Sequence, residues 1–128
     1  MWRTVFPYPG GLGLPGTMPN LEFKTTRNGT VAVVAPTGEL DLSGAAVLED
    51  ELDRLAAESE LVTLVLDLRG LEFMDSSGLR LVVMEDMRAR ETGRRFTLVR
   101  GCDTVHRVFE ITRMSERLEF VDAPGEGR

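Results

Sequence analysis

The stretch with the clearest chemical potential is Asp75-Ser76-Ser77-Gly78, which opens an amphipathic segment. Asp75 or Ser76 can cap a helix here, because short polar side chains accept hydrogen bonds from the free N–H groups of a first helical turn. A serine at this place exposes its hydroxyl, and an added phosphate suits the positive end of the helix dipole. The pattern predicts either a plain helix cap or a phosphorylation site that alters the surface without unfolding the domain.

Other motifs lack the context that their chemistry needs. Gly11–Gly16 satisfies the G-x-G-x-x-G spacing of dinucleotide-binding loops, but Pro15 removes a backbone donor and no helix follows. Asp67 ends an apolar strand as the phosphoacceptor of a receiver domain does, yet the acidic pair and the later lysine of such sites are missing. We interpret His106 as a structural residue and Cys102 as a small buried one.

The composition is typical of one globular domain. The chain has 128 residues, of which 42% are hydrophobic and 28% charged, and this suits a single core. Its net charge of -6 disfavours binding to nucleic acid or to anionic membrane surfaces. A single cysteine cannot form an internal disulfide or a thiolate metal cage. Without an apolar run of membrane-spanning length or a signal pattern, we expect a soluble cytoplasmic protein.

The periodicity after residue 20 predicts an α/β fold. Strands are expected at Leu21–Thr25, Val31–Val34, Leu61–Leu68, Phe96–Val99 and Leu118–Val121. The first two flank Asn28-Gly29, a dipeptide typical of hairpins, and Gly38–Asp41 is expected as a loop. Helices are expected at Ser43–Glu58, from Ser76 to Glu91 with a stop at Gly93, and after Asp103, which could cap a short helix. The order β-β-α-β-α-β-α-β implies a mixed β-sheet, mostly parallel after the first strand, with helices packed on it.

The two ends of the chain differ from this patterned part. Residues 1–20 hold Pro7, Pro9, Pro15 and Pro19, so we expect a flexible extension that forms no helix or strand ladder. Met18 is an alternative start, because patterned sequence begins at Leu21. The domain is expected to cover 21–122, and 123–128 to be a frayed tail.

The segment around Ser76 resembles the signature of a known family. Leu68–Leu79, with Phe73-Met74-Asp75-Ser76-Ser77-Gly78-Leu79 at its centre, resembles the signature of STAS domains of the bacterial anti-sigma factor antagonist type. Gly38-Glu39-Leu40-Asp41 is similar to the second hallmark of that family. The resemblance extends from about Leu21 to Asp122 and implies a STAS fold, which agrees with the element order above.

The resemblance implies a binding module rather than an enzyme. In the family, the unphosphorylated antagonist binds an anti-sigma factor and thereby frees the sigma factor. That anti-sigma factor is itself a serine kinase, which phosphorylates and expels the antagonist, and a serine phosphatase resets the switch. By resemblance the phosphoacceptor is Ser76, with Asp41 near it at the same edge of the sheet. We expect no catalytic residue, cofactor or metal site in this chain.

The helix that begins at Ser76 carries more apolar surface than one buried stripe needs. On a helical wheel, one group is expected to face inward: Leu79, Val82 and Val83. A second group faces another side: Ser77, Leu81, Met84 and Arg88. Either neighbouring loops cover this second side or it is a strip that binds a partner. The predicted partner-binding residues are Asp41, Asp75, Ser77, Leu81 and Met84.

Two alternatives stay open. A STAS scaffold without phosphorylation, in a signalling assembly or a lipid-transport complex, would use the same fold. A small hydrolase or ligand-binding domain would use Asp41, Asp75 and Ser76 in a pocket. This last alternative lacks a positioned base, because His106 belongs to a distant helix.

Overall fold

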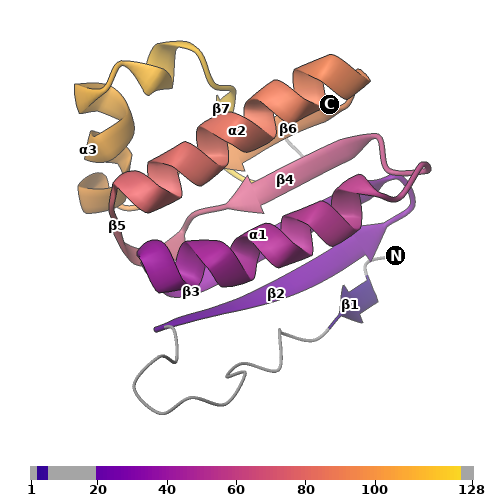
Figure 1. Ribbon diagram of the computed structural model, residues 1–128, viewed down its shortest axis with the longest axis horizontal. Helices are drawn as coiled ribbons and strands as arrows, with labels where there is room; N and C mark the ends of the chain where they lie inside the picture. Colours follow the sequence, from indigo (N-terminus) through magenta and orange to yellow (C-terminus); the bar gives the residue numbers. More distant parts are fainter. Residues whose placement is uncertain (1–2, 6–19, 125–128) are drawn as a thin grey trace.

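The computed structural model, which describes residues 3–5 and 20–124, contains a mixed sheet with helices on one face (Figure 1). The strands are β1 (Arg3–Val5), β2 (Leu21–Asn28), β3 (Val31–Leu40), β4 (Thr63–Asp67), β5 (Gly70–Met74), β6 (Arg95–Val99) and β7 (Phe120–Val121). The helices are α1 (Leu42–Ala56), α2 (Ser76–Thr92), α3 (Asp103–Ile111) and the short 3-10 helix η1 (Met114–Glu116). Figure 1 shows α1 and α2 side by side in front of the sheet.

The strand order in the sheet is β1-β2-β3-β4-β6-β7, and β5 pairs with the last part of β3, following β4 along that strand. The pairs β1–β2 and β2–β3 are antiparallel, whereas the pairs of β3 with β4, β4 with β6 and β6 with β7 are parallel. The β2–β3 hairpin turns through two residues after Asn28, and Gly29 supplies the positive φ of 59°. The predicted α/β class and mixed sheet are confirmed.

Strand β5 is absent from the order expected from the sequence. The predicted strand Leu61–Leu68 corresponds to β4 alone, and after a short break the chain forms β5. Strand β5 pairs in parallel with the end of β3, so Gly38–Leu40 is not the expected loop but the last part of β3, with a bulge between Gly38 and Glu39. This strand was missed because its burial does not alternate: Leu71 and Met74 are buried and the residues between them are exposed.

Three smaller expectations also need correction. Residues Arg3–Val5, expected in an extension without strand structure, pair with β2, while 6–19 and 125–128 lie outside the described residues. Asp103 is the first residue of α3 rather than its cap; Cys102 occupies the cap position without a side-chain hydrogen bond. Cys102 is exposed rather than buried, because it lies at the entry to α3, and its Sγ is 3.6 Å from the carbonyl oxygen of Leu71.

The main core lies between the sheet and the helices. The buried side of α1 carries Ala45, Leu48, Leu52 and Leu55, at the spacing of three and four that places side chains on one helical face. They pack with the inward residues of the strands in one cluster. On the opposite face of the sheet, Val33, Val65 and Val99 form a second, smaller cluster. The central strands are therefore apolar on both faces, as their near-continuous hydrophobic runs predict.

A buried polar group ties α1 to strand β2. The Thr25 hydroxyl donates a hydrogen bond to Glu51 at 2.5 Å, and Arg54 holds the same carboxylate with two N–H groups at 2.7 and 2.8 Å. Burial acts to raise the pKa of Glu51, but the hydrogen bonds from Arg54 and Thr25 together outweigh it, and the pKa lies below its usual value. The carboxylate is thus stable as an anion inside the domain.

Gly38, beside the bulge in β3, gives a test of the geometry that precedes Asp41. Its φ is 96°, and a Cβ there would lie 2.2 Å from the backbone oxygen of Asn20. Gly29 also has a positive φ, but a Cβ there meets open space. We expect Gly29→Ala to lower the free energy of unfolding by about 1–2 kcal/mol through backbone strain, and Gly38→Ala by about 2–5 kcal/mol because steric overlap is added.

Urea unfolding followed by circular dichroism measures both losses. Equal losses for Gly29→Ala and Gly38→Ala would contradict a fixed contact between Gly38 and Asn20.

Candidate functional site

The first turn of α2 presents Ser76 to solvent. Asp75 is the N-cap: its Oδ1 accepts hydrogen bonds from the backbone N–H groups of Ser77 at 2.8 Å and Gly78 at 3.4 Å. Ser76 is the first residue of the helix and is exposed. The Asp75 side chain therefore satisfies two donors of the helix N-terminus, and the Ser76 hydroxyl remains accessible for modification.

The start of α1 lies next to the start of α2. Asp41 caps α1 by accepting a hydrogen bond from Gly44 N–H at 2.9 Å. Leu40, just before Asp41, pairs with Met74 in the parallel β3–β5 ladder, and the Asp75 N–H donates to the carbonyl of Leu40 at 3.2 Å. The two capping aspartates thus follow paired residues of neighbouring strands. The structure places Asp41 at the same edge of the sheet as Ser76, as expected.

Gly78 allows α2 to pack closely at this edge. A Cβ on Gly78 would lie 2.6 Å from the side chain of Met74 and 2.8 Å from that of Leu40. Such distances leave no room for any side chain, so the glycine fixes the height of the first helical turn above the strand ends. The position of Ser76 depends on this contact because the serine lies two residues before Gly78.

A groove runs between α1 and α2 beside this edge. It has a volume of about 290 Å³ and is lined by Leu42, Ala45, Ala46, Glu49, Ser77, Arg80, Leu81 and Met84. Two of its apolar side chains are strongly exposed, Leu42 at 74% and Met84 at 47%. Large apolar side chains in an open hollow next to an accessible serine are typical of a surface that meets another protein.

The predicted partner-binding residues divide into two groups. Ser77, Leu81 and Met84 line the groove, whereas Asp41 and Asp75 serve as the helix caps at its end. Leu81, expected in an exposed strip, is only 6% exposed. It is buried because α2 packs against α1 as well as against the sheet, so its buried arc is wider than the helical wheel predicts.

Sequence reasoning missed five of the eight groove residues: Leu42, Ala45, Ala46, Glu49 and Arg80. Leu42 is the first residue of α1, and Glu49 lies two turns further along that helix. Arg80 stands four residues after Ser76, on the same face of α2. This last spacing was visible in the sequence and could have identified Arg80. The contribution of α1 was hidden, because only the packing of the two helices reveals it.

A buried carboxylate lies where α1 and α2 pack together. Glu85 on α2 is 3% exposed, and Arg88 lies 3.7 Å from it while donating to Asp53 of α1 at 2.7 Å. Burial raises the pKa of Glu85; Arg88 opposes this effect, and Asp53 adds to it. The ionised form of Glu85 therefore lowers the stability of the folded state. Glu85 directly follows Met84, which lines the groove.

The structure gives no support for a histidine-dependent hydrolase. The His106 ring packs edge-on against Phe120 at 4.9 Å and near Phe109, and it is buried. Burial lowers its pKa, with a further contribution from Arg100. Its Nδ1 has no hydrogen-bond partner within residues 3–5 and 20–124. The ring thus faces an aromatic cluster on the side of β7, which fits the structural role expected from the sequence.

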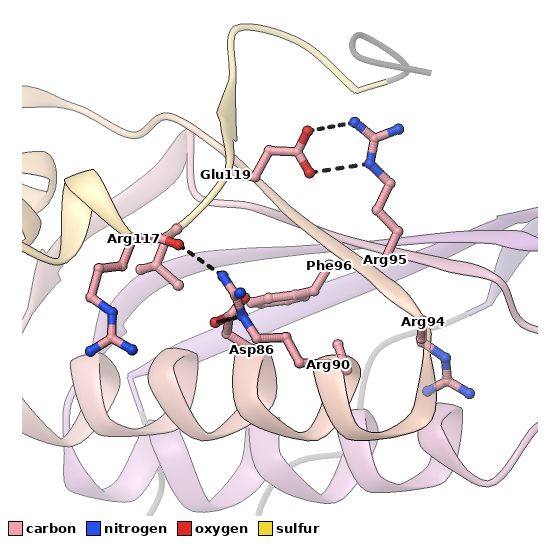
Figure 2. A pocket seen from close by; sticks show the side chains of 9 residues that line it. Asp86, Arg90, Arg94, Arg95, Phe96, Arg117 and Glu119 are labelled. Atoms are coloured by element: carbon pink, nitrogen blue, oxygen red, sulfur yellow. Dashed lines mark hydrogen bonds and ion pairs between the residues drawn. The ribbon is translucent and has the colours of Figure 1, made fainter.

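A second cavity of about 290 Å³ lies at the opposite end of α2 (Figure 2). It is lined by Asp86, Ala89, Arg90, Arg94, Arg95, Phe96, Arg117, Leu118 and Glu119. Figure 2 shows that two of its four arginines are paired with carboxylates: Arg90 with Asp86 at 2.8 Å and Arg95 with Glu119 at 2.5 Å. The Arg95–Glu119 pair ties β6 to the segment before β7, and Arg90 ties α2 to the same segment by donating to the carbonyl of Arg117 at 3.1 Å. We therefore assign these contacts a structural role.

Within residues 3–5 and 20–124, no three His, Cys, Asp or Glu side chains are grouped so that they could hold a metal ion. Over the same residues, none of the helices combines the length and the apolar character that crossing a bilayer requires.

Comparisons with known proteins agree with this architecture. The family described as "Mlab, STAS domain" matches residues 23–122. The chain is 24% identical over 103 residues to the anti-sigma F factor antagonist of Paenibacillus polymyxa, covering 80% of this chain and 88% of that protein.

Solved structures with a similar fold include an anti-sigma factor antagonist from Mycobacterium paratuberculosis, with a TM-score of 0.74, 24% identity and coverage of 88% of this chain and 92% of that one. The anti-sigma factor antagonist SpoIIAA in its unphosphorylated form has a TM-score of 0.70, 24% identity and coverage of 81% and 90%. Its phosphorylated form from Bacillus has a TM-score of 0.66, 23% identity and coverage of 81% and 93%.

The raised pKa of Glu85 predicts a pH-dependent effect of Glu85→Gln. A carboxyl whose pKa is raised in the folded state destabilises the fold when ionised, and protonation removes this cost as the pH falls through the raised pKa. We expect the free energy of unfolding of Glu85→Gln, minus that of the parent, to be higher at pH 7.5 than at pH 4.5. Urea unfolding at both pH values measures this difference, and Glu91→Gln, at an exposed position of the same helix, is the control. A stability difference for Glu85→Gln that is the same at both pH values would contradict the assignment.

Proposed function

The chain belongs to the STAS domain family, and we propose that within it the protein acts as an anti-sigma factor antagonist. In its unphosphorylated form it binds an anti-sigma factor that is also a serine kinase, and the sigma factor is released. Phosphorylation of Ser76 ends this binding, and a serine phosphatase restores it. The names of its relatives support the general role.

One observation carries the proposal: the exposed Ser76 lies at the capped start of α2, beside the groove that α1 and α2 form. A partner that contacts Leu42 and Met84 in this groove would also approach the Ser76 hydroxyl. The phosphate would then be added inside the contact surface. A phosphorylation site at the margin of an apolar docking groove is the arrangement that partner switching requires.

The expected electrostatic effect is large enough for a switch. A phosphoryl group adds about -1.5 to -2 charges at neutral pH. At this edge it joins the carboxylates of Asp41 and Asp75, so burying it against a partner costs several kcal/mol in desolvation and repulsion. A loss of about 3 kcal/mol weakens binding more than a hundredfold. The domain itself need not unfold, because the addition is at an exposed residue.

The chemistry of the switch belongs to the partners. The kinase supplies ATP, Mg²⁺ and the catalytic groups, while this chain supplies the acceptor hydroxyl of Ser76. We therefore propose that the protein is a cytoplasmic binding module without catalytic residues or cofactors. Its acidic surface, with a net charge of -6, fits a protein partner better than nucleic acid or an anionic membrane.

A second candidate is a STAS scaffold that works without phosphorylation, in a signalling or lipid-transport complex. The family description that matches the chain names the STAS domain and no sigma pathway, and the scaffold is compatible with that description. Phosphopeptide mapping of the protein from its native cells, with identification of co-purified proteins, separates the two. Phosphate on Ser76 together with a serine-kinase partner supports the antagonist; an unmodified Ser76 without such a partner, in growth and under stress, supports the scaffold.

Substitutions of Ser76 test the switch directly. With the co-purified kinase and ATP, we expect Ser76→Ala to stay bound to the partner while the parent is released. Ser76→Asp, which carries about half the charge of a phosphate, should weaken binding about tenfold or more without ATP. Calorimetric titration or a pull-down measures both effects. Ser77→Ala is the matched control and should be released by ATP as the parent is. If both Ser76 variants bind as the parent does, phosphorylation of Ser76 does not control the interaction.

A further inference from the structure

We propose that Arg80 is the counter-ion of phosphorylated Ser76, and that forming this pair withdraws the guanidinium from the groove between α1 and α2. This inference rests on the proposed function, because it concerns the state in which Ser76 carries phosphate. Nothing in the family description or in the names of the relatives assigns a role to this position.

The helical spacing brings the two side chains together. Ser76 and Arg80 are four residues apart on α2, and residues at this spacing are neighbours on the helix surface, with Cβ atoms about 5–6 Å apart. Side chains in a helix point back toward its N-terminus, so the long Arg80 side chain can extend toward the Ser76 hydroxyl. Both residues are exposed, and no backbone change is needed for a guanidinium to meet a phosphate there.

Two of the backbone donors at the start of α2 are already engaged and are not free to bind a phosphate. Its Ser77 and Gly78 N–H groups already donate to the Asp75 carboxylate. The Asp41 carboxylate is also close to the strand ends, as the cap of α1. A phosphate on Ser76 therefore enters a region where carboxylates hold the helix donors. A cation one helical turn away is the group that can stabilise its second negative charge.

Arg80 is available for this task. In the described part of the chain, no hydrogen bond or ion pair engages its side chain, whereas Arg88 pairs with Asp53 at 2.7 Å and Arg90 with Asp86 at 2.8 Å. Arg80 instead lines the groove together with Glu49 of α1. Recruiting it to the phosphate leaves the Glu49 side of the groove more acidic. Phosphorylation of Ser76 would thus change the charge of the groove lining as well as the charge at the start of α2.

The test measures the second pKa of the phosphate by phosphorus NMR on the full chain, with phosphoserine installed at position 76 during synthesis, so that no kinase or partner is involved. This pKa is about 6 for an unperturbed phosphoserine. A nearby guanidinium favours the dianion and lowers it. We expect Arg80→Gln to raise the phosphate pKa by about 0.2–0.4 pH unit relative to the parent, the size of an exposed pair at this spacing. Arg80→Lys should retain most of the lowering.

The matched control is Arg90→Gln, the same substitution on the same helix. Arg90 lies fourteen residues beyond Ser76, about 21 Å along the axis, which exceeds the screening length of about 10 Å at 0.1 M salt. We expect this variant to shift the phosphate pKa by less than about 0.1 pH unit. A second readout is the Arg80 Nε–H resonance, which should shift when Ser76 is phosphorylated.

Two results would overturn the inference. An equal phosphate pKa in the parent and Arg80→Gln would show that Arg80 does not contact the phosphate. Equal shifts in Arg80→Gln and Arg90→Gln would show only a general effect of net charge. Neither result bears on partner binding. Conversely, failure of the Ser76→Ala binding test would remove the proposed function without altering this pKa difference, so the two failures are distinguishable.

Discussion

The site depends on one backbone constraint: the end of β3 pairs in parallel with β5, and the Asp75 N–H donates to the carbonyl of Leu40. Because each strand is followed at once by a helix, this pairing sets two helix N-termini next to each other. Each start is capped by an aspartate, which satisfies free N–H groups that would otherwise face solvent. The close contact of Gly78 with Leu40 and Met74 then fixes the height of α2.

This geometry explains why a phosphate at Ser76 would act on binding rather than on folding. A phosphate at a helix start usually gains from unsatisfied N–H groups, but here Asp75 already holds two of them. The added charge therefore contributes less to the helix and remains available to a partner or to a neighbouring cation. The groove next to it is held by the packing of α1 against α2, where Arg88 joins Asp53 and approaches Glu85.

Much of this could be predicted from the sequence because local rules decide it. Asp75 and Asp41 fit helix capping, Asn28-Gly29 marks the hairpin, and Gly93 ends α2 in the left-handed conformation. The sequence did not reveal β5, the burial of Leu81 or the groove. These depend on contacts between segments distant in the chain: β5 exists through its pairing with β3, and Leu81 is buried by α1. Local periodicity carries no information about such partners.

Arg90 and Arg80, toward the two ends of α2, differ in their contacts within the fold. At its C-terminal end, Arg90 is paired with Asp86 and donates to the carbonyl of Arg117, so the cation there is engaged within the fold (Figure 2). In its N-terminal half, α2 carries Arg80, whose side chain has no partner within residues 3–5 and 20–124, and the exposed Met84 lines the same groove from the middle of the helix. Exposed ion pairs add little stability each, but a cation that is engaged in one is less able to attract a partner. Arg80 and Met84 therefore line the groove together with Ser77, and a modification of Ser76, one helical turn before Arg80, can act on this lining.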